Sequence, residues 1–287
     1  MEMNFYDTSF FRSNSSSSQL PQLPSPASIL QQYAHQGASV VKYAYLSLAV
    51  KFGDACYLRI EEAQTMRALR QVFVHGEVPV PEVFGWKRYG DQNFIYVSLI
   101  AGLTLREAWP LLDDKDKARI CDDLSCINQS LRRLKQIPSH PFIGSVNGRT
   151  VQDRFFKLDY EKGPFSTIAS FNDWLLAAAT RQKPEAGVII TGPLREYLPD
   201  EGEIYFTHGD LTLGNIIISD VLGSWGIVGV VDWEQAGWYP EYWEYCKLLY
   251  GVEYSHEWRN DGWADTVINP FGQEWEVFAE YSSWRCP

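Results

Sequence analysis

The sequence predicts an α+β protein with two lobes, a small β-rich N-terminal lobe and a larger, mainly helical C-terminal lobe. The chain has 287 residues, which at about 150 residues per domain corresponds to two domains or one large one. Hydrophobic residues make up 45% of the chain and charged residues 21%, so a sizeable core can be buried. The residue pattern also changes near residue 100, from strand-like segments to helical periodicity.

The first 26 residues are rich in Ser, Gln, Asn and Pro. Such a composition offers too little apolar surface to offset the chain entropy lost on folding, so residues 1–26 are expected to form a disordered arm. A short helix is expected next, with Ser28 as its N-cap and with Ile29, Leu30 and Tyr33 on one face.

Residues 27–100 are expected to form the N-terminal lobe, in the order strand, strand, helix, strand, strand. β-Branched and aromatic residues fill the predicted strands, and the helix has apolar residues at helical spacing. The predicted strands are residues 39–43, 46–52, 83–86 and 94–99, and the predicted helix is residues 61–75. Gly102 follows the last strand and separates it from the next lobe.

Residues 101–287 are expected to form the C-terminal lobe. Apolar residues at i, i+3, i+7 and i+10 from Leu124 define one face of a long helix over residues 113–136. Residues 138–166 are rich in Pro and Gly and are expected to be a loop. Further helices are predicted at 171–180, 241–250 and 274–281, and short strands at 204–206, 215–218 and 227–231.

The formal net charge of the chain is −11, and its isoelectric point is about 5.0. This charge argues against nonspecific binding to nucleic acid or to an anionic membrane, because both need a basic face. Residues 200–287 contain sixteen acidic and three basic residues, so the negative charge is concentrated in the C-terminal lobe. Such a lobe would attract a cationic small molecule.

Cysteine usage and apolar runs indicate the compartment. The five cysteines are scattered without a Cys-x-x-Cys pair, which is typical of reduced thiols and does not suggest a zinc site. The N-terminus lacks the apolar core of a signal peptide, and no apolar run reaches the length of about 18 residues that spans a membrane. The sequence therefore predicts a cytoplasmic protein and leaves its oligomeric state open.

The segment from Thr207 to Ile218 carries the chemistry. It contains His208-Gly209-Asp210, with Asn215 five residues further on, and a later predicted strand ends at Asp232. Phosphoryl transfer needs a carboxylate beside the attacking hydroxyl and oxygen ligands for Mg²⁺. Asp210 suits the first role, and Asn215 and Asp232 suit the second. In the alternative interpretation, Asp210 and Asn215 are turn residues and Asp232 caps a helix.

The motifs HGDLxxxN, from His208, and VDWExAGWYPEYWEY, from Val231, resemble the aminoglycoside phosphotransferase family of kinase-like enzymes, and especially its fungal branch. The resemblance extends over about residues 39–285 and implies a protein-kinase-like fold. It implies that Asp210 is the catalytic base and that Asn215 and Asp232 bind Mg²⁺. It gives His208 a turn-shaping role, and we expect a buried, structural histidine.

Weaker similarities lie in the N-terminal lobe. Ala49-Val50-Lys51-Phe52 resembles the family strand whose lysine contacts the ATP phosphates, and Glu62 fits the carboxylate partner of that lysine on the following helix. Lys42 is a competing candidate that ranks below Lys51. The alternative for Lys51 is an ordinary solvated residue at a strand end.

Two features depart from the family pattern. No Gly-x-Gly loop lies between Val41 and Leu48, although backbone amides that bind phosphates usually depend on glycine. Ser98 stands where relatives often carry an acid, so adenine contacts there would come mainly from the backbone. Phosphate binding is therefore expected to be looser or differently built.

The aromatic segment from Gly237 to Tyr245 is the other distinctive part of the pattern. Gly237 and Pro240 predict a loop that leads into a helix, and Glu241 and Glu244 favour the positive N-terminal end of that helix. We expect its aromatic side chains to belong to the core of the lobe. The alternative is an aromatic pocket for an amine.

Together the residues and the resemblance predict an ATP- and Mg²⁺-dependent enzyme that transfers the γ-phosphoryl group to a hydroxyl of a small, amine-bearing, cationic acceptor. The alternative is a non-catalytic kinase-fold module that binds a nucleotide or a metabolite, which the missing glycine loop favours. The sequence leaves open the identity of the acceptor and the choice between ATP and GTP.

Overall fold

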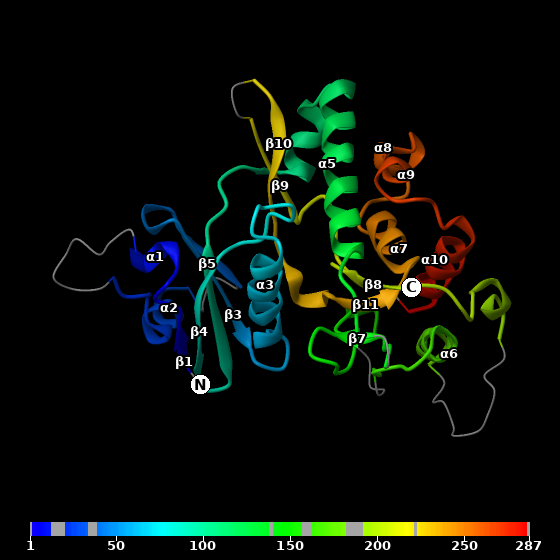
Figure 1. Cartoon of the computed structure of the whole chain (residues 1–287), viewed down its shortest axis with the longest axis horizontal. Helices are drawn as coiled ribbons and strands as arrows, with labels where there is room; N and C mark the ends of the chain where they lie inside the picture. Colours follow the sequence, from blue (N-terminus) through cyan, green and yellow to red (C-terminus); the bar gives the residue numbers. More distant parts are fainter. Residues whose placement is uncertain are drawn as a thin grey trace. The chain divides into compact units, whose positions relative to one another are not determined.

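The computed structural model describes residues 2–12, 21–33, 39–137, 140–156, 162–181, 192–220 and 223–285 (Figure 1). The chain divides into two compact units. Unit 1 comprises Met1–Gly102 together with Val228–Glu234, and unit 2 comprises Leu103–Ile227 together with Gln235–Pro287. A single boundary at residue 100 does not describe this division, because residues 228–234, which include Asp232, belong to unit 1.

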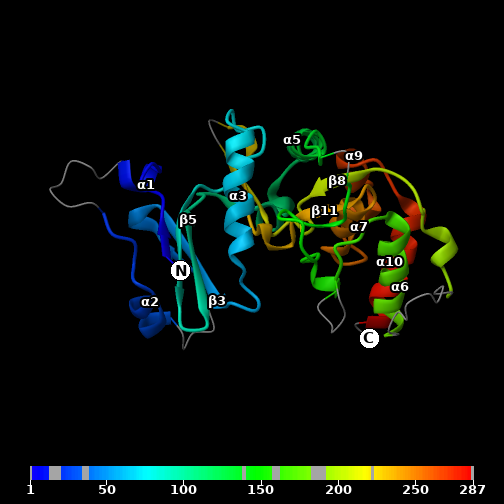
Figure 2. The same ribbon diagram turned by 60° about the horizontal axis from the view of Figure 1, so that its bottom comes forward.

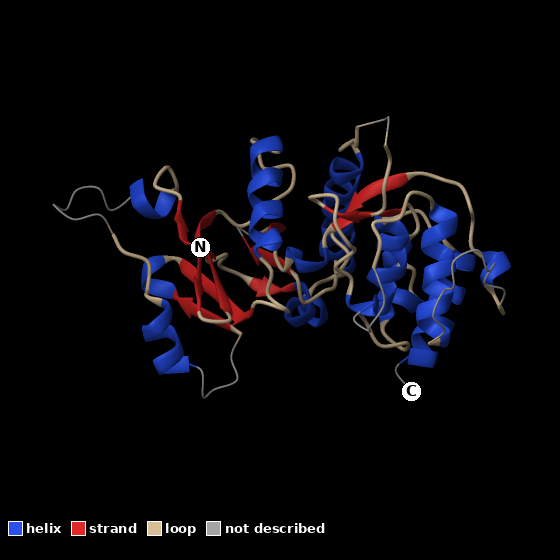
Figure 3. Ribbon diagram, turned by 90° about the horizontal axis from the view of Figure 1, so that it is seen from below, coloured by secondary structure: helices blue, strands red, loops and turns tan. Residues whose placement is uncertain are grey.

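Unit 1 is built on a β-sheet, whose strands are drawn in red in Figure 3. The sheet has five strands in the order β1-β4-β5-β3-β2. Neighbouring strands in this sheet pair antiparallel. The strands are β1 (Glu2–Asn4), β2 (Val40–Tyr43), β3 (Leu48–Asp54), β4 (Val83–Tyr89) and β5 (Gln92–Ser98). The four strands predicted for residues 27–100 are thus β2 to β5, and β1 was not predicted.

Helix α3 (Ile60–Val72) follows β3 and packs on β4 and β5 (Figures 1 and 2). Its buried face includes Met66 and Leu69 from the spacing that predicted the helix, whereas Val72 from the same spacing is 57% exposed. Helix α2 (Pro26–Tyr33) is the short helix expected near Ser28. Its cap is Ser25, however, because the Ser25 Oγ accepts the N–H of Ser28 at 3.2 Å.

Residues 2–12 and 21–26 differ from the disordered arm that their composition suggests: in the second of these segments Leu23 is buried and α2 begins at Pro26. Strand β1 pairs with β4, and a short helix α1 (Ser9–Arg12) carries Phe10 and Phe11, each 4% exposed. These two rings join the core formed by β2 to β5 and α2. The amino-acid composition averaged over residues 1–26 does not reveal these two neighbouring aromatic residues. The two rings nevertheless bury enough apolar surface to order the segment. Residues 13–20 of the expected arm lie outside the described residues.

Unit 2 is mainly helical, as predicted (Figure 3). Its helices are α4 (Leu105–Ala108), α5 (Asp114–Arg132), α6 (Ile168–Thr180), α7 (Trp243–Tyr250), α8 (Glu257–Asn260), α9 (Trp263–Val267) and α10 (Gly272–Arg285). Helix α5 begins where Asp113 accepts the N–H of Asp116 at 2.8 Å. Helix α6 begins with a capping box in which Thr167 and Ser170 bond each other.

The core of unit 2 is centred on Trp243, which is fully buried. Its ring stacks on Tyr239 at 5.6 Å and meets Phe171 and Phe278 edge-on at 5.1 and 5.2 Å. Ring pairs of this kind each contribute about 0.5–1.5 kcal/mol beyond the buried area. The aromatic segment 237–245 is therefore core, as expected, rather than a ligand pocket.

Two small sheets complete unit 2. One has the order β10-β9-β6 and the other β7-β11-β8. The strands are β6 (Leu103–Thr104), β7 (Gly144–Ser145), β8 (Ile204–Thr207), β9 (Ile216–Asp220), β10 (Trp225–Val230, whose last residues belong to unit 1) and β11 (Gly237–Pro240). The sequence predicted a loop at Gly237–Pro240, but pairing with β8 and β7 makes it a strand. Pro240 is tolerated because β7 pairs only with Gly237 and Trp238, which leaves that edge of β11 open at Pro240.

Among the described residues, no helix is both long and apolar enough to cross a membrane.

Candidate active site

In unit 1, Lys51 is surrounded by three carboxylates. Its Nζ lies 2.6 Å from Asp232 Oδ1, 2.9 Å from Glu62 Oε2 and 2.9 Å from Glu234 Oε2. Lys51 comes from the middle of β3, opposite Ile95 of β5, and Glu62 comes from the first turn of α3. The predicted partners Lys51 and Glu62 therefore meet.

Asp232 reaches this cluster from the turn after β10. Its φ of +66° lies in the left-handed region, which Asp and Asn enter more readily than other side chains. Glu234, two residues after Asp232 on the same turn, is a member of the cluster that the sequence motifs do not predict. The sequence does contain one signal for this cluster, namely two acidic residues separated by a single position.

The charges in this cluster do not balance. Burial lowers the pKa of Lys51, but the three carboxylates outweigh this effect and raise the pKa above its usual value. Burial raises the pKa of Glu62 to about 7, against the opposing effect of Lys51. One ammonium thus faces three acids whose oxygens lie within 4.8 Å of one another. Such a group of hard oxygen donors suits a divalent cation.

The other predicted residues lie in unit 2, on the turn after β8. The Asn215 Nδ2 donates to the Asp210 backbone oxygen at 2.8 Å and to Asp210 Oδ2 at 3.1 Å. Those bonds use the amide nitrogen of Asn215 and leave its Oδ1 as an oxygen donor for a cation. Asp210 and Asn215 are therefore neighbours, while Lys51, Glu62 and Asp232 belong to unit 1.

His208 is fully buried, and its Nδ1 accepts the backbone N–H of Asp210 at 3.2 Å. This is the turn-shaping histidine that the resemblance implies. Gly209 next to it has a φ of +75°, and an added Cβ would lie 2.7 Å from the backbone oxygen of Gln235. Both the conformation and the close approach call for glycine at this position.

Glu244 holds the same turn from α7. Its carboxylate accepts the backbone N–H of His208 at 2.6 Å and that of Gly209 at 3.2 Å. Burial raises the pKa of Glu244 to about 7, and the two backbone hydrogen bonds oppose that rise. The sequence suggested only that Glu244 favours the N-terminal end of a helix, because its contact with residue 208 is not visible in a local pattern.

The remaining sequence candidates lie elsewhere. Lys42 is exposed on β2, and it takes part in no ion pair among the residues that the structure describes. Where the family pattern would place a glycine loop, the chain makes a short 3₁₀ turn at Ala44–Leu46. The Ser98 hydroxyl accepts the backbone N–H of Glu82 at 2.9 Å, so this side chain has a structural partner.

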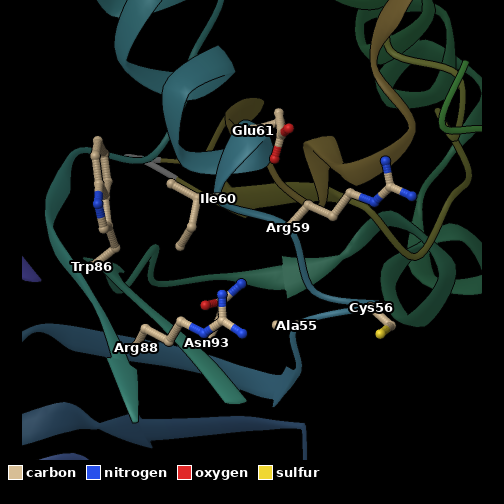
Figure 4. A pocket seen from close by; sticks show the side chains of 8 residues that line it. All are labelled: Ala55, Cys56, Arg59, Ile60, Glu61, Trp86, Arg88 and Asn93. Carbon is tan, nitrogen blue, oxygen red and sulfur yellow. The ribbon is translucent and has the colours of Figure 1, made fainter. Parts of the chain in front are cut away.

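Unit 1 also has a cavity of about 450 Å³ between the start of α3 and the β4–β5 hairpin (Figure 4). Its lining residues are Ala55, Cys56, Arg59, Ile60, Glu61, Trp86, Arg88 and Asn93. None of the predicted site residues lines it.

A strand lysine paired with a helix glutamate, and a helical unit with an Asp–Asn turn after a strand, define an α+β protein of the kinase-like class. A sequence profile of the phosphotransferase enzyme family (APH) matches residues 58–281, and the chain belongs to this family. None of the curated proteins compared with the chain matches it. The fungal-branch resemblance stays a prediction.

Solved structures share the fold. The GDP complex of wild-type aminoglycoside 2'-phosphotransferase-IIIa is 15% identical, with 89% of this chain and 85% of that chain covered and a TM-score of 0.51. Aminoglycoside phosphotransferase APH(3'')-Id from Streptomyces rimosus is 16% identical, with 90% and 97% covered and a TM-score of 0.50. Its complex with ADP and streptomycin is also 16% identical, with 89% and 98% covered and a TM-score of 0.50.

Proposed function

We propose that this phosphotransferase uses ATP and Mg²⁺ to phosphorylate a hydroxyl of a small, amine-bearing molecule, with Asp210 as the catalytic base. The observation that carries the proposal is the pair of clusters described above. Lys51 meets Glu62 and Asp232 in unit 1, and Asp210 meets Asn215 in unit 2. Phosphoryl transfer depends mainly on positioning and on charge stabilisation, and these residue types supply both.

Lys51 is proposed to contact the phosphates of ATP. Its hydrogen bond to Glu62 holds the ammonium at a fixed position on β3. The surrounding acids keep Lys51 charged throughout the physiological pH range, because they raise its pKa. A permanent positive charge at this position would neutralise negative charge on the transferred group.

Each unit offers oxygen donors of the kind that Mg²⁺ prefers. Asp232 and Glu234 offer carboxylate oxygens beside Lys51, and Asn215 offers an amide oxygen. Asp232 and Asn215 are the proposed ligands, and Glu234 is a further acidic ligand on the same turn as Asp232. When bound, the ion would neutralise phosphate charge and orient the phosphates.

Asp210 is proposed to accept the proton of the acceptor hydroxyl. The hydroxyl oxygen forms a bond to the γ-phosphorus, the bond from that phosphorus to the bridging oxygen breaks, and ADP leaves with the electron pair. A hydrogen bond from Asn215 holds the Asp210 carboxylate, His208 accepts the Asp210 backbone N–H, and Glu244 accepts the backbone N–H groups of the preceding residues 208 and 209. This support fixes the direction of the base before the acceptor arrives.

The acceptor is proposed to be cationic. Residues 200–287 contain sixteen acids and three bases, and this charge would attract an amine. One of the similar solved structures, that of APH(3'')-Id, is a complex with ADP and streptomycin, which is a cationic small molecule. A ligand of that class on a protein of the same fold supports a cationic acceptor for this chain.

A purified-protein assay tests the proposal. We expect acceptor-dependent consumption of ATP that requires Mg²⁺, screened over hydroxylated amines. Asp210→Asn should lower turnover by at least about a hundredfold, because it removes the base. Asp122→Asn, an exposed residue on α5, is the matched control and should keep full activity. Equal turnover in Asp210→Asn and wild type would overturn the role of Asp210.

A thermal-shift measurement separates an enzyme from the non-catalytic module. Mg²⁺-ATP that binds the folded protein must raise its melting temperature. A shift without any turnover would favour a nucleotide-binding module, which the glycine-free turn at Ala44–Leu46 makes the second candidate. No shift at millimolar Mg²⁺-ATP would contradict nucleotide use altogether.

A further inference from the structure

Unit 2 buries an ion pair beside the turn that carries Asp210. The Lys247 Nζ lies 3.0 Å from Asp153 Oδ1, and the two residues are 4% and 1% exposed. The Trp243 indole donates to the other carboxylate oxygen of Asp153 at 3.0 Å. The carboxylate is therefore bonded at both oxygens in the centre of the aromatic core.

Lys247 also holds Gln235. Its Nζ donates to Gln235 Oε1 at 3.2 Å, and the backbone N–H of Arg154 donates to the same oxygen at 3.0 Å. The Tyr239 hydroxyl donates to the backbone oxygen of Gln235 at 3.1 Å. Gln235 is 1% exposed and is thus fixed at its side chain and at its backbone.

Gln235 in turn lies directly against Gly209. An added Cβ on Gly209 would lie 2.7 Å from the Gln235 backbone oxygen and 3.2 Å from its carbonyl carbon. Gly209 precedes Asp210, so any displacement of Gln235 is passed to the backbone that carries the Asp210 carboxylate. Close-packed interiors transmit such displacements because they contain few voids.

Helix α7 contacts the same turn at a second point. Glu244 accepts the N–H groups of His208 and Gly209, and Lys247 follows it by three residues on the same helix. Residues three apart lie on one face of a helix. One face of α7 thus carries Glu244, which accepts hydrogen bonds from the turn, and Lys247, which bonds to Gln235, the residue that packs against the turn.

A buried ion pair is a poor way to gain stability, because desolvation of the two charges offsets most of their attraction. The contacts of Lys247 with Asp153 and Gln235 suggest a different use. We propose that Lys247, with Asp153, is a positioning residue for Asp210: it fixes Gln235, and Gln235 fixes the backbone of Gly209. The catalytic consequence rests on the proposed function, whereas the structural link does not.

Three variants test this link. Lys247→Met removes the donors and leaves Asp153 as a buried charge without its ammonium, whereas the double variant Asp153→Asn/Lys247→Met removes both charges. Lys117→Met is the matched control: Lys117 is 8% exposed, pairs with Glu257 at 3.0 Å and lies 5.1 Å over the Trp109 ring. Like Lys247 it is a buried lysine paired with an acid, but within the described part of the chain its ammonium bonds to Glu257 and to neither Asp153 nor Gln235.

Amide hydrogen exchange gives the readout that is independent of activity. We expect exchange in the peptide covering residues 207–215 to become about tenfold faster in the double variant, with α5 unchanged. Lys117→Met should leave that peptide unchanged, even if its melting temperature falls. The proposal is overturned if the double variant leaves residues 207–215 unchanged, or if exchange rises equally in α5 and α6, which would indicate a merely structural pair.

Kinetics test the catalytic consequence. Where an acceptor supports turnover, the double variant should lower kcat about ten- to a hundredfold and leave the KM for ATP unchanged, because the base is misplaced and the nucleotide contacts are not. An unchanged kcat together with faster exchange at 207–215 would overturn the positioning role. If wild-type protein turns over no acceptor, the proposed function fails, and hydrogen exchange alone then decides the link from Lys247 to the turn.

Discussion

Lys51 and Asp232 are 181 positions apart in the sequence, and the Lys51 Nζ lies 2.6 Å from Asp232 Oδ1. The contact exists because the chain returns to unit 1 for the short segment Val228–Glu234. It joins a residue proposed to bind phosphate and a residue proposed to bind metal within a single unit. The same ammonium also pairs with Glu62 and Glu234, so three acids share it.

The first prediction concerns the charge balance around Lys51. Lys51→Met removes the cation that the three acids share, so the free energy of unfolding should fall by about 3 kcal/mol. The double variant Lys51→Met/Glu62→Gln should recover most of that loss, because the most deeply buried of the acids is then neutral. Urea unfolding followed by tryptophan fluorescence measures both changes.

A surface ion pair in the same unit provides the control. Lys87 lies 2.9 Å from Glu2 Oε1, but the Glu2 side chain is 58% exposed. Lys87→Met should therefore cost less than about 1 kcal/mol. Equal losses in Lys51→Met and Lys87→Met would mean that water screens the Lys51 cluster as it screens a surface pair.

The second prediction compares two glycines with the same backbone conformation. Gly209 and Gly262 both have a φ of +75°, but an added Cβ meets the Gln235 oxygen at 2.7 Å in the first case and nothing within 4 Å in the second. Gly262→Ala should cost about 1 kcal/mol, from the left-handed conformation alone. Gly209→Ala should cost a further 1–3 kcal/mol or so from the clash. Similar unfolding free energies for the two variants would show that the turn relaxes away from Gln235.

Local patterns in the sequence predicted much of the fold and part of the site. The strand around Lys51 and the helix around Glu62 have clear periodicity, and the spacing of Asp210 and Asn215 is a short-range motif. Glu244, Asp153 and Lys247 were not predicted as a group, because each has its bonding partner far away in the chain. In the sequence, a charged residue that is buried in the fold cannot be distinguished from one at the surface until its partner is known.

The same limit explains the errors in secondary structure. The segment Gly237–Pro240 begins with glycine and ends with proline, which is typical of a loop. It is nevertheless a strand, because β8 and β7 supply its hydrogen-bonding partners. At the N-terminus, Phe10 and Phe11 are ordered by a core whose other residues come mostly from later in the chain, on α2 and β2 to β5. In both cases tertiary contacts override the local preference.

The third prediction concerns pH. Glu244 is a carboxyl group whose pKa is raised to about 7 in the folded state, from 4.5. Folded protein then binds more protons than unfolded protein between these values, so the contribution of Glu244 to stability is fully present below pH 4.5 and is lost as the pH rises to about 7. The upper limit of that loss is about 3 kcal/mol.

The variant Glu244→Gln keeps an acceptor for the His208 N–H but cannot ionise. Its stability should therefore decline less than that of wild type between about pH 5 and pH 8, in urea unfolding at constant ionic strength. Glu253→Gln, an exposed acid in the same unit, is the control and should follow the wild-type curve. A Glu244→Gln curve parallel to wild type would show that Glu244 has an ordinary pKa.

The fourth prediction tests the ordered N-terminus. Phe11 is 4% exposed, and its ring meets Phe10 edge-on at 5.1 Å. Phe11→Ala should lower the free energy of unfolding by about 3–5 kcal/mol, because it removes a buried ring and leaves a cavity. Tyr45→Ala, at a side chain that is 82% exposed, should change it by less than about 0.5 kcal/mol. Equal stabilities of the two variants would mean that residues 2–12 do not pack on the sheet in solution, and the disordered arm suggested by composition would then describe them better.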